Sequence, residues 1–211
     1  ALLWLLELRQ HHLTDETSPP SVASRNLAEL ATPADPRQES SRVAQLVQAM
    51  PVLAGEQPVL DTLLWHTRRW HEQTEQQIAA LSRRELAATQ AVARHRLVQV
   101  LRVLVQTMEQ SPATKIVVFA RWSQTLAALQ HALGRFYPRN MVAQFHAGLT
   151  QDELQQSVDR FQAQAECQIL LCDELGGEGR NFQIADTIIH MDLPWTPAQI
   201  EQRIGRVDRL G

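Results

Sequence analysis

The chain has 211 residues, of which 44% are apolar and 20% are charged, and its formal net charge is −3. These values are typical of a globular protein and exclude a disordered, collagen-like or disulfide-scaffold chain. Because the chain is slightly acidic, any nucleic-acid binding must depend on a local basic patch. Its two cysteines, Cys167 and Cys172, are too few for a four-cysteine zinc site and indicate a reducing compartment.

The first 114 residues predict helices and loops. Seven of the ten prolines precede residue 115, whereas seven of the eight glycines follow it. The segment 14–38 is rich in Pro, Ser, Thr and Asp and predicts mostly loop. Apolar residues at helical spacing predict the other elements: a helix over 2–13, a helix from Ser40 or Ser41 to about Leu53, and two long antiparallel helices over 59–111 that meet near Ser82–Glu85.

The second part of the chain alternates strands and helices. The expected strands are Lys115–Ala120, Met141–His146, Gln168–Cys172 and Asp186–Asp192. The expected helices are Ser123–Phe136, Gln151–Gln162 and Pro197–Arg209. Alternation with short links predicts an α/β domain over 115–211, with a parallel sheet flanked by helices, preceded by a helical region over 1–114.

A glycine-rich loop follows the third expected strand. After Cys172 the chain reads DELGGEGRN, with Gly176, Gly177 and Gly179 in four positions. Glycines there permit positive φ angles and close approach of the backbone to a phosphate, and they equally fit a tight turn.

An arginine pair lies in the last expected helix, in the segment QRIGRVDR. Arg206 and Arg209 are three residues apart and Gln202 is one turn before Arg206, so all three would share a helix face. Two arginine forks on one face suit a polyphosphate, although a solvated arginine-rich helix has the same pattern. Gly205 between them predicts a close approach of another group.

Two further strand ends carry polar residues. Arg121 and Trp122 follow the first strand, and His146–Gly148 ends the second. We find no Ser–His–Asp arrangement, no catalytic carboxylate pair and no metal-ligand spacing. Lys115 is the only lysine and follows Thr114, so the chain has no G-x-x-x-x-G-K-[ST] phosphate loop.

In this order, the segments KIVVFARW, FHAGLTQDELQQSVDRF, LLCDELGGEGRNFQ and IEQRIGRVDRLG resemble motifs IV to VI of the second RecA-like lobe of superfamily 2 helicases and translocases. EGRNFQ, DLPW-x-P and EQRIGR-x-DR are similar to the Swi/Snf-type branch, and within it to the RapA-like bacterial ATPases associated with RNA polymerase. The resemblance covers residues 115–211. Residues 1–114 occupy the position of a helical protrusion and linker.

For nucleotide binding, the resemblance implies that Arg206 and Arg209 are arginine fingers facing the γ-phosphate of ATP bound with Mg²⁺. It implies that Gln202 orients them, and that Gly177, Gly179 and Asn181 connect the nucleotide cleft to the nucleic-acid track. The first lobe, which would supply the phosphate loop and the Mg²⁺-binding acidic motif, is not in this sequence. The chain by itself is therefore expected to be inactive and to be a fragment of the enzyme.

For nucleic acid, the resemblance implies contacts to the phosphate backbone. Such contacts weaken with salt and are largely independent of the base sequence. The residues implied are Arg121, Gly148, Thr150, Glu174 and Gly176. Leu154 departs from the family pattern, because many members carry an arginine there that supports such a contact. Asp173, Glu174 and Glu178 also make the loop more acidic than a phosphate cradle requires.

The resemblance favours a translocase on duplex DNA that works with a first lobe, with RNA polymerase as a further partner. No segment has the ~20 apolar residues of a membrane span, and the expected location is the bacterial cytoplasm, with the nucleoid. The alternatives are an RNA helicase of the same superfamily, a non-catalytic docking module, and an α/β domain whose arginines form surface ion pairs.

Overall fold

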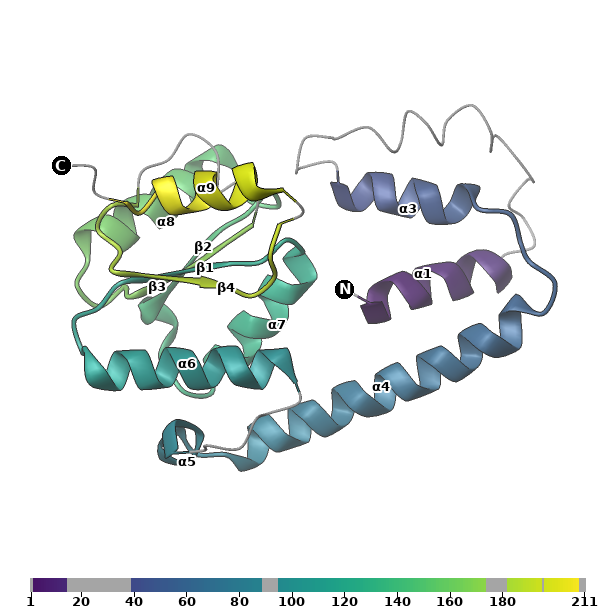
Figure 1. Cartoon of the computed structure of the whole chain (residues 1–211), viewed down its shortest axis with the longest axis horizontal. Helices are drawn as coiled ribbons and strands as arrows, with labels where there is room; N and C mark the ends of the chain where they lie inside the picture. Colours follow the sequence, from purple (N-terminus) through teal and green to yellow (C-terminus); the bar gives the residue numbers. More distant parts are fainter. Residues whose placement is uncertain (1, 15–38, 89–94, 174–181, 195, 209–211) are drawn as a thin grey trace. The chain divides into compact units, whose positions relative to one another are not determined.

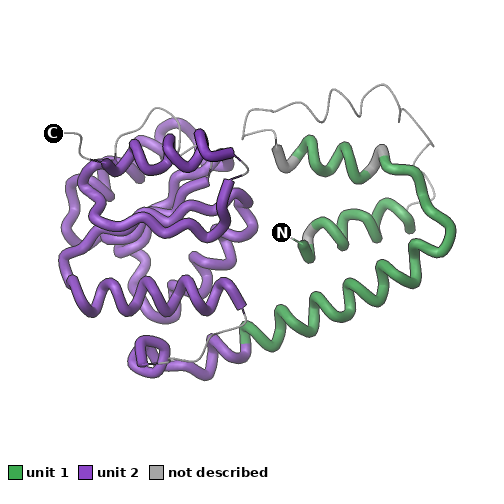
Figure 2. The backbone as a smooth tube through the Cα atoms, viewed as in Figure 1, with its two compact units in different colours: residues 1–75 green, residues 76–211 purple. Residues whose placement is uncertain are grey.

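The computed structural model describes residues 2–14, 39–88, 95–173, 182–194 and 196–208 (Figure 1). The chain forms two compact units, residues 1–75 and 76–211, which we call the helical unit and the sheet unit (Figure 2). The boundary lies within helix α4, Glu56–Ala80. The sequence placed the boundary after residue 114 and so assigned helix α6, Arg96–Gln110, to the helical region. In the structure α6 packs against the sheet and belongs to the sheet unit.

The helical unit contains α1 (Leu2–Thr14), α3 (Glu39–Ala49) and the larger part of α4. The Arg9 side chain connects all three regions. Its Nε and Nη2 donate to the two carboxylate oxygens of Glu56 at 2.7 and 2.9 Å, and its remaining N–H groups bond to the carbonyls of Val47, Met50 and Pro51. This buried arginine therefore closes the carbonyl end of α3 and the start of α4 together.

The helix break expected near Ser82–Glu85 is present, but the second of the two expected long helices was wrong: the described residues after the break form a short helix and the separate helix α6, which starts at its own cap residue His95. Helix α4 ends at Ala80, and Ser82 begins helix α5 (Arg83–Ala88) through a capping box with Glu85. Helix α5 lies against α6, where Gln106 donates to the carbonyl of Ala87 at 2.7 Å. Residues 15–38, which belong to the segment expected to be mostly loop, and residues 89–94 lie outside the described residues. No helix of the described ranges combines the length and apolar character of a membrane span.

The sheet has four parallel strands in the order β2-β3-β1-β4. They are β1 (Ile116–Phe119), β2 (Val142–Phe145), β3 (Ile169–Cys172) and β4 (Thr187–His190). Each central strand, β1 or β3, is a continuous apolar run that is buried along its whole length, as expected for a strand covered on both faces. The expected parallel sheet is confirmed.

Helices cover both faces of this sheet (Figure 1). Ile116 and Val118 of β1 face α6 and α7 (Ser123–Leu133), and Val117 and Phe119 face the side of α8 (Gln151–Ala163). The two-residue period of the strand explains this division. A short 3₁₀ helix, η2 (Arg139–Met141), precedes β2, and α9 (Pro197–Gly205) follows β4. The predicted fold class, a helix-flanked parallel sheet after an all-helical segment, is confirmed.

Lys115 closes the carboxyl end of α8. Its Nζ donates to the carbonyls of Phe161, Gln164 and Cys167, and its ammonium lies 5.0 Å from the centre of the Phe161 ring. Burial lowers the pKa of the Lys115 ammonium. The last carbonyls of a helix lack intrahelical partners, and a cation with three donors can satisfy several of them at once; the Gln164 carbonyl also accepts the Cys167 N–H at 3.2 Å.

We expect Lys115→Met to lower the free energy of unfolding of the sheet unit by about 2–4 kcal/mol, because buried carbonyls lose a charged donor. Urea unfolding measures the loss. Arg96→Met, at an exposed arginine on α6, is the control and should change the stability by no more than about 0.5 kcal/mol. Equal effects of the two substitutions would contradict this role for Lys115.

The Arg9–Glu56 pair predicts an acid-sensitive helical unit. Hydrogen bonds from Arg9 and from the Leu53 N–H lower the pKa of Glu56 from 4.5 to about 2. A carboxylate with a lowered folded pKa stabilises the fold above the unfolded pKa, and this contribution is lost as the pH falls from 4.5 towards 2.

At neutral pH, Glu56→Gln should therefore speed amide hydrogen exchange in residues 2–14 by roughly five- to thirtyfold. Mass spectrometry of peptides from the helical unit, corrected for intrinsic exchange rates, measures the change. The two proteins should converge near pH 2, where Glu56 is half-protonated. A difference that stays constant with pH would show that the charge of Glu56 is not its cause.

Candidate functional site

The carboxyl ends of the four parallel strands meet at one edge of the sheet, where open α/β sheets bind their ligands. Arg121 follows β1, His146 follows β2, Asp173 follows β3, and Asp192 lies two residues beyond the end of β4. Two of the predicted site segments, those of Arg121 and Gly148, therefore lie at this edge, as expected.

Asp192 holds the segment that follows β1. Both carboxylate oxygens of Asp192 accept the backbone N–H of Arg121, each at 3.0 Å. The Arg121 guanidinium lies over the Trp122 ring, 5.4 Å from its centre. The predicted nucleic-acid residue Arg121 is thus fixed at its backbone by a carboxylate from the segment that follows the neighbouring strand β4, while its partly exposed side chain stacks on the next residue.

Arg203 of α9 contacts the same carboxylate and is 1% exposed. Its Nη1 donates to the Asp192 carbonyl at 3.1 Å, and its Nη2 lies 4.0 Å from Oδ1 of Asp192. The guanidinium also lies over the Phe119 ring, with 5.1 Å to the centre. A buried arginine with a carboxylate and an aromatic face as neighbours is held in one orientation, and it fixes α9 against β1 and β4.

His190 completes this cluster at the end of β4. Its Nδ1 is 3.3 Å from Nη1 of Arg203, and its ring stacks on Phe119. Burial, and then the positive charge of Arg203, lower the pKa of His190. A neutral imidazole can accept an N–H at Nδ1, so the Arg203 cation and His190 are compatible neighbours.

Asp173 has the same role for the segment after β2. Its Oδ2 accepts the backbone N–H of Ala147 at 2.7 Å, and the residue is 5% exposed. Asp173 was expected among the acidic residues of a ligand-facing loop, but its carboxylate is turned into the protein. Each of the two aspartates therefore secures the turn after the adjacent strand, Asp173 on β2 and Asp192 on β1.

The turn after β2 is compact. The Gly148 N–H donates to Nδ1 of His146 at 3.1 Å, and a Cβ on Gly148 would lie only 3.1 Å from the His146 ring. Thr150 caps α8, because its hydroxyl accepts the Glu153 N–H and the Glu153 carboxylate accepts the Thr150 N–H at 2.8 Å. These bonds lower the pKa of Glu153. The predicted phosphate contacts of Gly148 and Thr150 stay predictions.

Leu154 explains one departure from the family pattern. It is buried against the sheet in the cluster that contains Phe145 and Phe161. The side chain therefore contributes to the core beneath α8, where a leucine is suited and an arginine would need a partner.

The last helix is shorter than expected. Helix α9 ends at Gly205, and Arg206 is its C-cap residue, so the prediction of a helix through Arg209 was wrong in its extent. The Arg206 carbonyl accepts the Phe182 N–H at 2.7 Å, and the Gln183 side chain donates to the Asp208 carbonyl at 3.3 Å. These bonds connect the end of α9 to the residues that follow the glycine-rich segment.

Gly205 does not show the close approach that was predicted for it. A Cβ added there would have nothing within 4 Å in the described part of the chain. Gln202 is exposed on α9 and Arg206 is partly exposed one turn later. The face that carries the predicted nucleotide residues is thus open to solvent.

The other predicted site residues lie outside the described residues: Glu174, Gly176, Gly177, Gly179, Asn181 and Arg209. Within the described residues, no group of three His, Cys, Asp or Glu side chains could hold a metal ion. The sequence did not indicate that Asp192 and Arg203 hold the segments at the carboxyl ends of β1 and β4 together.

The family of helicase conserved C-terminal domains matches residues 96–211. The chain belongs to this family. The match includes α6, which agrees with the packing of α6 on the sheet. The predicted resemblance to helicase second lobes is thereby confirmed.

The curated relatives include RNA polymerase-associated proteins RapA of several bacteria. The chain is 38% identical to RapA of Vibrio atlanticus over 109 residues, which are 51% of the chain and 11% of that protein. It is 40% identical to RapA of Proteus mirabilis over 98 residues, 46% of the chain and 10% of that protein. The similarity therefore spans about a tenth of the length of these bacterial proteins.

Two of the solved structures that are similar to this chain are helicase or ATPase domains. Domain 2 of the Mss116p DEAD-box helicase, bound to an RNA duplex, is 26% identical with a TM-score of 0.48, over 55% of this chain and 45% of that one. The C-terminal part of the Fun30 ATPase domain is 14% identical with a TM-score of 0.49, over 99% of this chain and 74% of that one. The family assignment rests on the sequence match.

Asp192 should be required for stability at the strand ends. We expect Asp192→Ala to lower the free energy of unfolding by about 2–4 kcal/mol, because the buried Arg203 cation loses its neighbouring carboxylate and the Arg121 N–H loses its acceptor. Urea unfolding tests this, with Asp208→Ala at an exposed aspartate after α9 as the control. Similar losses in both variants would show that the Asp192 carboxylate has no special role.

Proposed function

We propose that this chain contributes the second lobe of a Swi/Snf-type, ATP-dependent DNA translocase related to RapA. The family match and the RapA similarity support a helicase-type ATPase. The observation that supports the site is the cluster of Asp192 and Arg203. It holds the segment of Arg121 and helix α9 at one sheet edge, so that groups assigned to nucleic acid and to nucleotide move as one body.

In this proposal Arg206 and Arg209 stabilise the negative charge that develops on the γ-phosphate during hydrolysis. Gln202, one turn before Arg206, orients the phosphate-facing groups. The side chains of Gln202 and Arg206, which the structure describes, carry N–H donors and reach solvent at the end of α9. This arrangement fits an anionic ligand. ATP with Mg²⁺ supplies the phosphoryl group and the charge-neutralising metal, held mainly by a first lobe.

Gly177, Gly179 and Asn181 form the connection from the nucleotide to the nucleic-acid track in this proposal. Arg121, Gly148, Thr150, Glu174 and Gly176 follow the phosphate backbone of one strand. The contacts are largely independent of sequence and weaken with salt. Since Asp173 is turned inward, one of the carboxylates of the acidic segment does not oppose a phosphate there.

The wider proposal follows from the relatives. Their name associates RapA with RNA polymerase, and we propose that polymerase is a partner of the complete protein, in the bacterial cytoplasm at the nucleoid. The 211-residue chain by itself should not hydrolyse ATP, because the sequence has no G-x-x-x-x-G-K-[ST] loop.

The test is ATP hydrolysis by the full-length protein that carries this lobe, with and without duplex DNA. Arg206→Ala should reduce DNA-stimulated hydrolysis by roughly 10³-fold or more, because an arginine finger is worth 10³–10⁵ in rate. Arg96→Ala, an exposed arginine of α6, is the control and should leave the rate unchanged.

Hydrolysis that persists without Arg206 would refute the finger assignment and favour a docking role. Duplex RNA in place of DNA, combined with a strand-displacement assay, separates the translocase from an RNA helicase. Stimulation by RNA alone, together with strand separation, would contradict the DNA assignment.

A further inference from the structure

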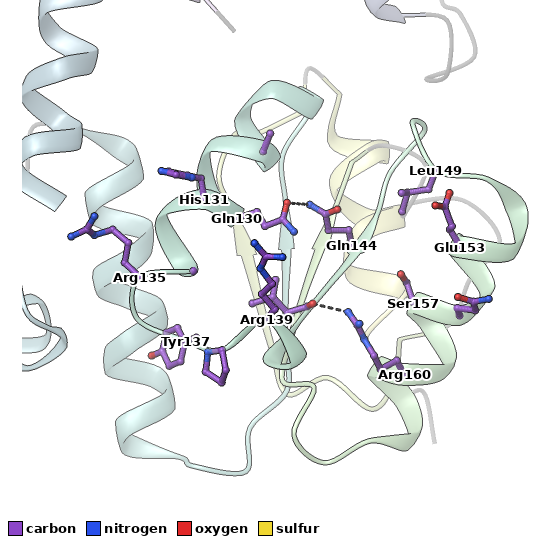
Figure 3. A pocket seen from close by; sticks show the side chains of 15 residues that line it. Gln130, His131, Arg135, Tyr137, Arg139, Gln144, Leu149, Glu153, Ser157 and Arg160 are labelled. Carbon is purple, nitrogen blue, oxygen red and sulfur yellow. Dashed lines mark hydrogen bonds between the residues drawn. The ribbon is translucent and has the colours of Figure 1, made fainter. Parts of the chain in front are cut away.

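A hollow of about 1010 Å³ opens on the sheet unit along the outer edge of β2, from the segment before β2 to the first turn of α8 (Figure 3). Helix α7 and helix α8 form its walls and the segment before β2 forms one end. We call it the β2 groove and define it by six of its lining residues: Gln130, His131, Arg135, Arg139, Ser157 and Arg160.

The β2 groove is basic in a chain whose net charge is −3. Arg135, Arg139 and Arg160 line it with His131, and Glu153 is the carboxylate among the lining residues. Glu153 is already bonded to Thr150 at the start of α8. Within the described ranges none of the three arginines is in an ion pair: Arg135 bonds to the carbonyl of Ala79, and Arg160 bonds to the carbonyl of Val142 and to the Cys167 side chain.

The floor of the groove is the open edge of a strand. The carbonyls of Met141 and Phe145 accept the N–H groups of Gln168 and Asp173, which flank β3. The backbone N–H and C=O groups of the alternate residues, Val142 and Gln144, therefore point away from β3. Val142 is satisfied there, because its N–H bonds to Arg139 and its carbonyl accepts Arg160. Gln144 is the position at which a further extended chain can pair with β2.

We propose that the β2 groove binds an extended acidic peptide segment of a partner protein. Carboxylates of the peptide pair with Arg139 and Arg135 at the groove's rim, and its backbone bonds to Gln144 at the floor. This combines two known recognition modes, addition of a strand to a sheet edge and capture of acidic motifs by arginines.

A peptide fits this surface better than a nucleic-acid strand does. Non-specific binding of single strands relies on exposed aromatic rings on which bases stack. Tyr137, the phenol ring in the lining, is 3% exposed and is therefore not available as a platform. The open backbone position at Gln144 matches another peptide backbone. The proposal does not depend on the ATPase assignment, because none of the residues assigned above to nucleotide or nucleic acid lines the groove. The one connection is the hydrogen bonding of Thr150 to Glu153, which is a lining residue.

The experiment measures fluorescence anisotropy of a labelled decapeptide of alternating Glu and Val on adding the full 211-residue chain. A Gln-Val decapeptide is the matched neutral probe. Binding of the acidic peptide should exceed that of the neutral one and should weaken with salt. Arg139→Glu should weaken it roughly tenfold or more, which corresponds to about 1.4 kcal/mol.

Two further variants and one competitor decide the outcome. Arg96→Glu, at an exposed arginine that does not line the groove, should leave the affinity within roughly twofold, while Ser157→Glu on the α8 wall should lower it. Circular dichroism confirms that each variant is folded. No preference for the acidic peptide, or equal losses for Arg139→Glu and Arg96→Glu, would overturn the proposal. So would binding of single-stranded DNA that depends on Arg139 while the peptide does not bind.

Discussion

The buried cation of Arg203 determines how the strand ends of the sheet unit are organised. Arg203 lies on a helix that follows the last strand, yet it contacts the carboxylate and carbonyl of Asp192, the imidazole of His190 and the ring of Phe119. An unpaired charge at this depth would be very unfavourable, so its neighbours must come together for the helix to pack at all. Residues from β1, β4 and α9 therefore adopt their positions as one cooperative unit.

The two central strands were predictable because each is an uninterrupted apolar run between polar turns. Ile116–Phe119 and Ile169–Cys172 leave few alternatives to a strand buried on both faces. Helix starts were equally visible, since Thr150 with Glu153 and Thr196 with Pro197 are recognised start signals. The end of α9 was not, because the segment after Gly205 keeps a helix-compatible composition while its backbone bonds to Phe182 instead.

The candidate site was predictable from the sequence only in part. The arginines of QRIGRVDR suggest a ligand-facing row, but the pattern does not distinguish Arg203, which is buried, from Arg206, which is partly exposed. The difference arises from the crossing of α9 over the sheet, which is a tertiary property. In the same way, Asp173 and Asp192 look like acidic surface residues in sequence, and their roles appear only when neighbouring strands place backbone N–H groups beside them. The family was predicted correctly from the sequence, because the resemblance depends on the order of several motifs along the chain and not on the conformation of any one side chain.

The carbonyl contacts of Lys115 have a consequence for chemical labelling. The chain contains a single lysine, and its Nζ is surrounded by the carbonyls of Phe161, Gln164 and Cys167. An acylating reagent needs an accessible, unprotonated ε-amine, and this one becomes reachable only when the carboxyl end of α8 separates from the start of β1. Acylation of the lysine side chain would therefore mark opened molecules of the sheet unit, and amine-directed cross-linkers would find no lysine on its folded surface.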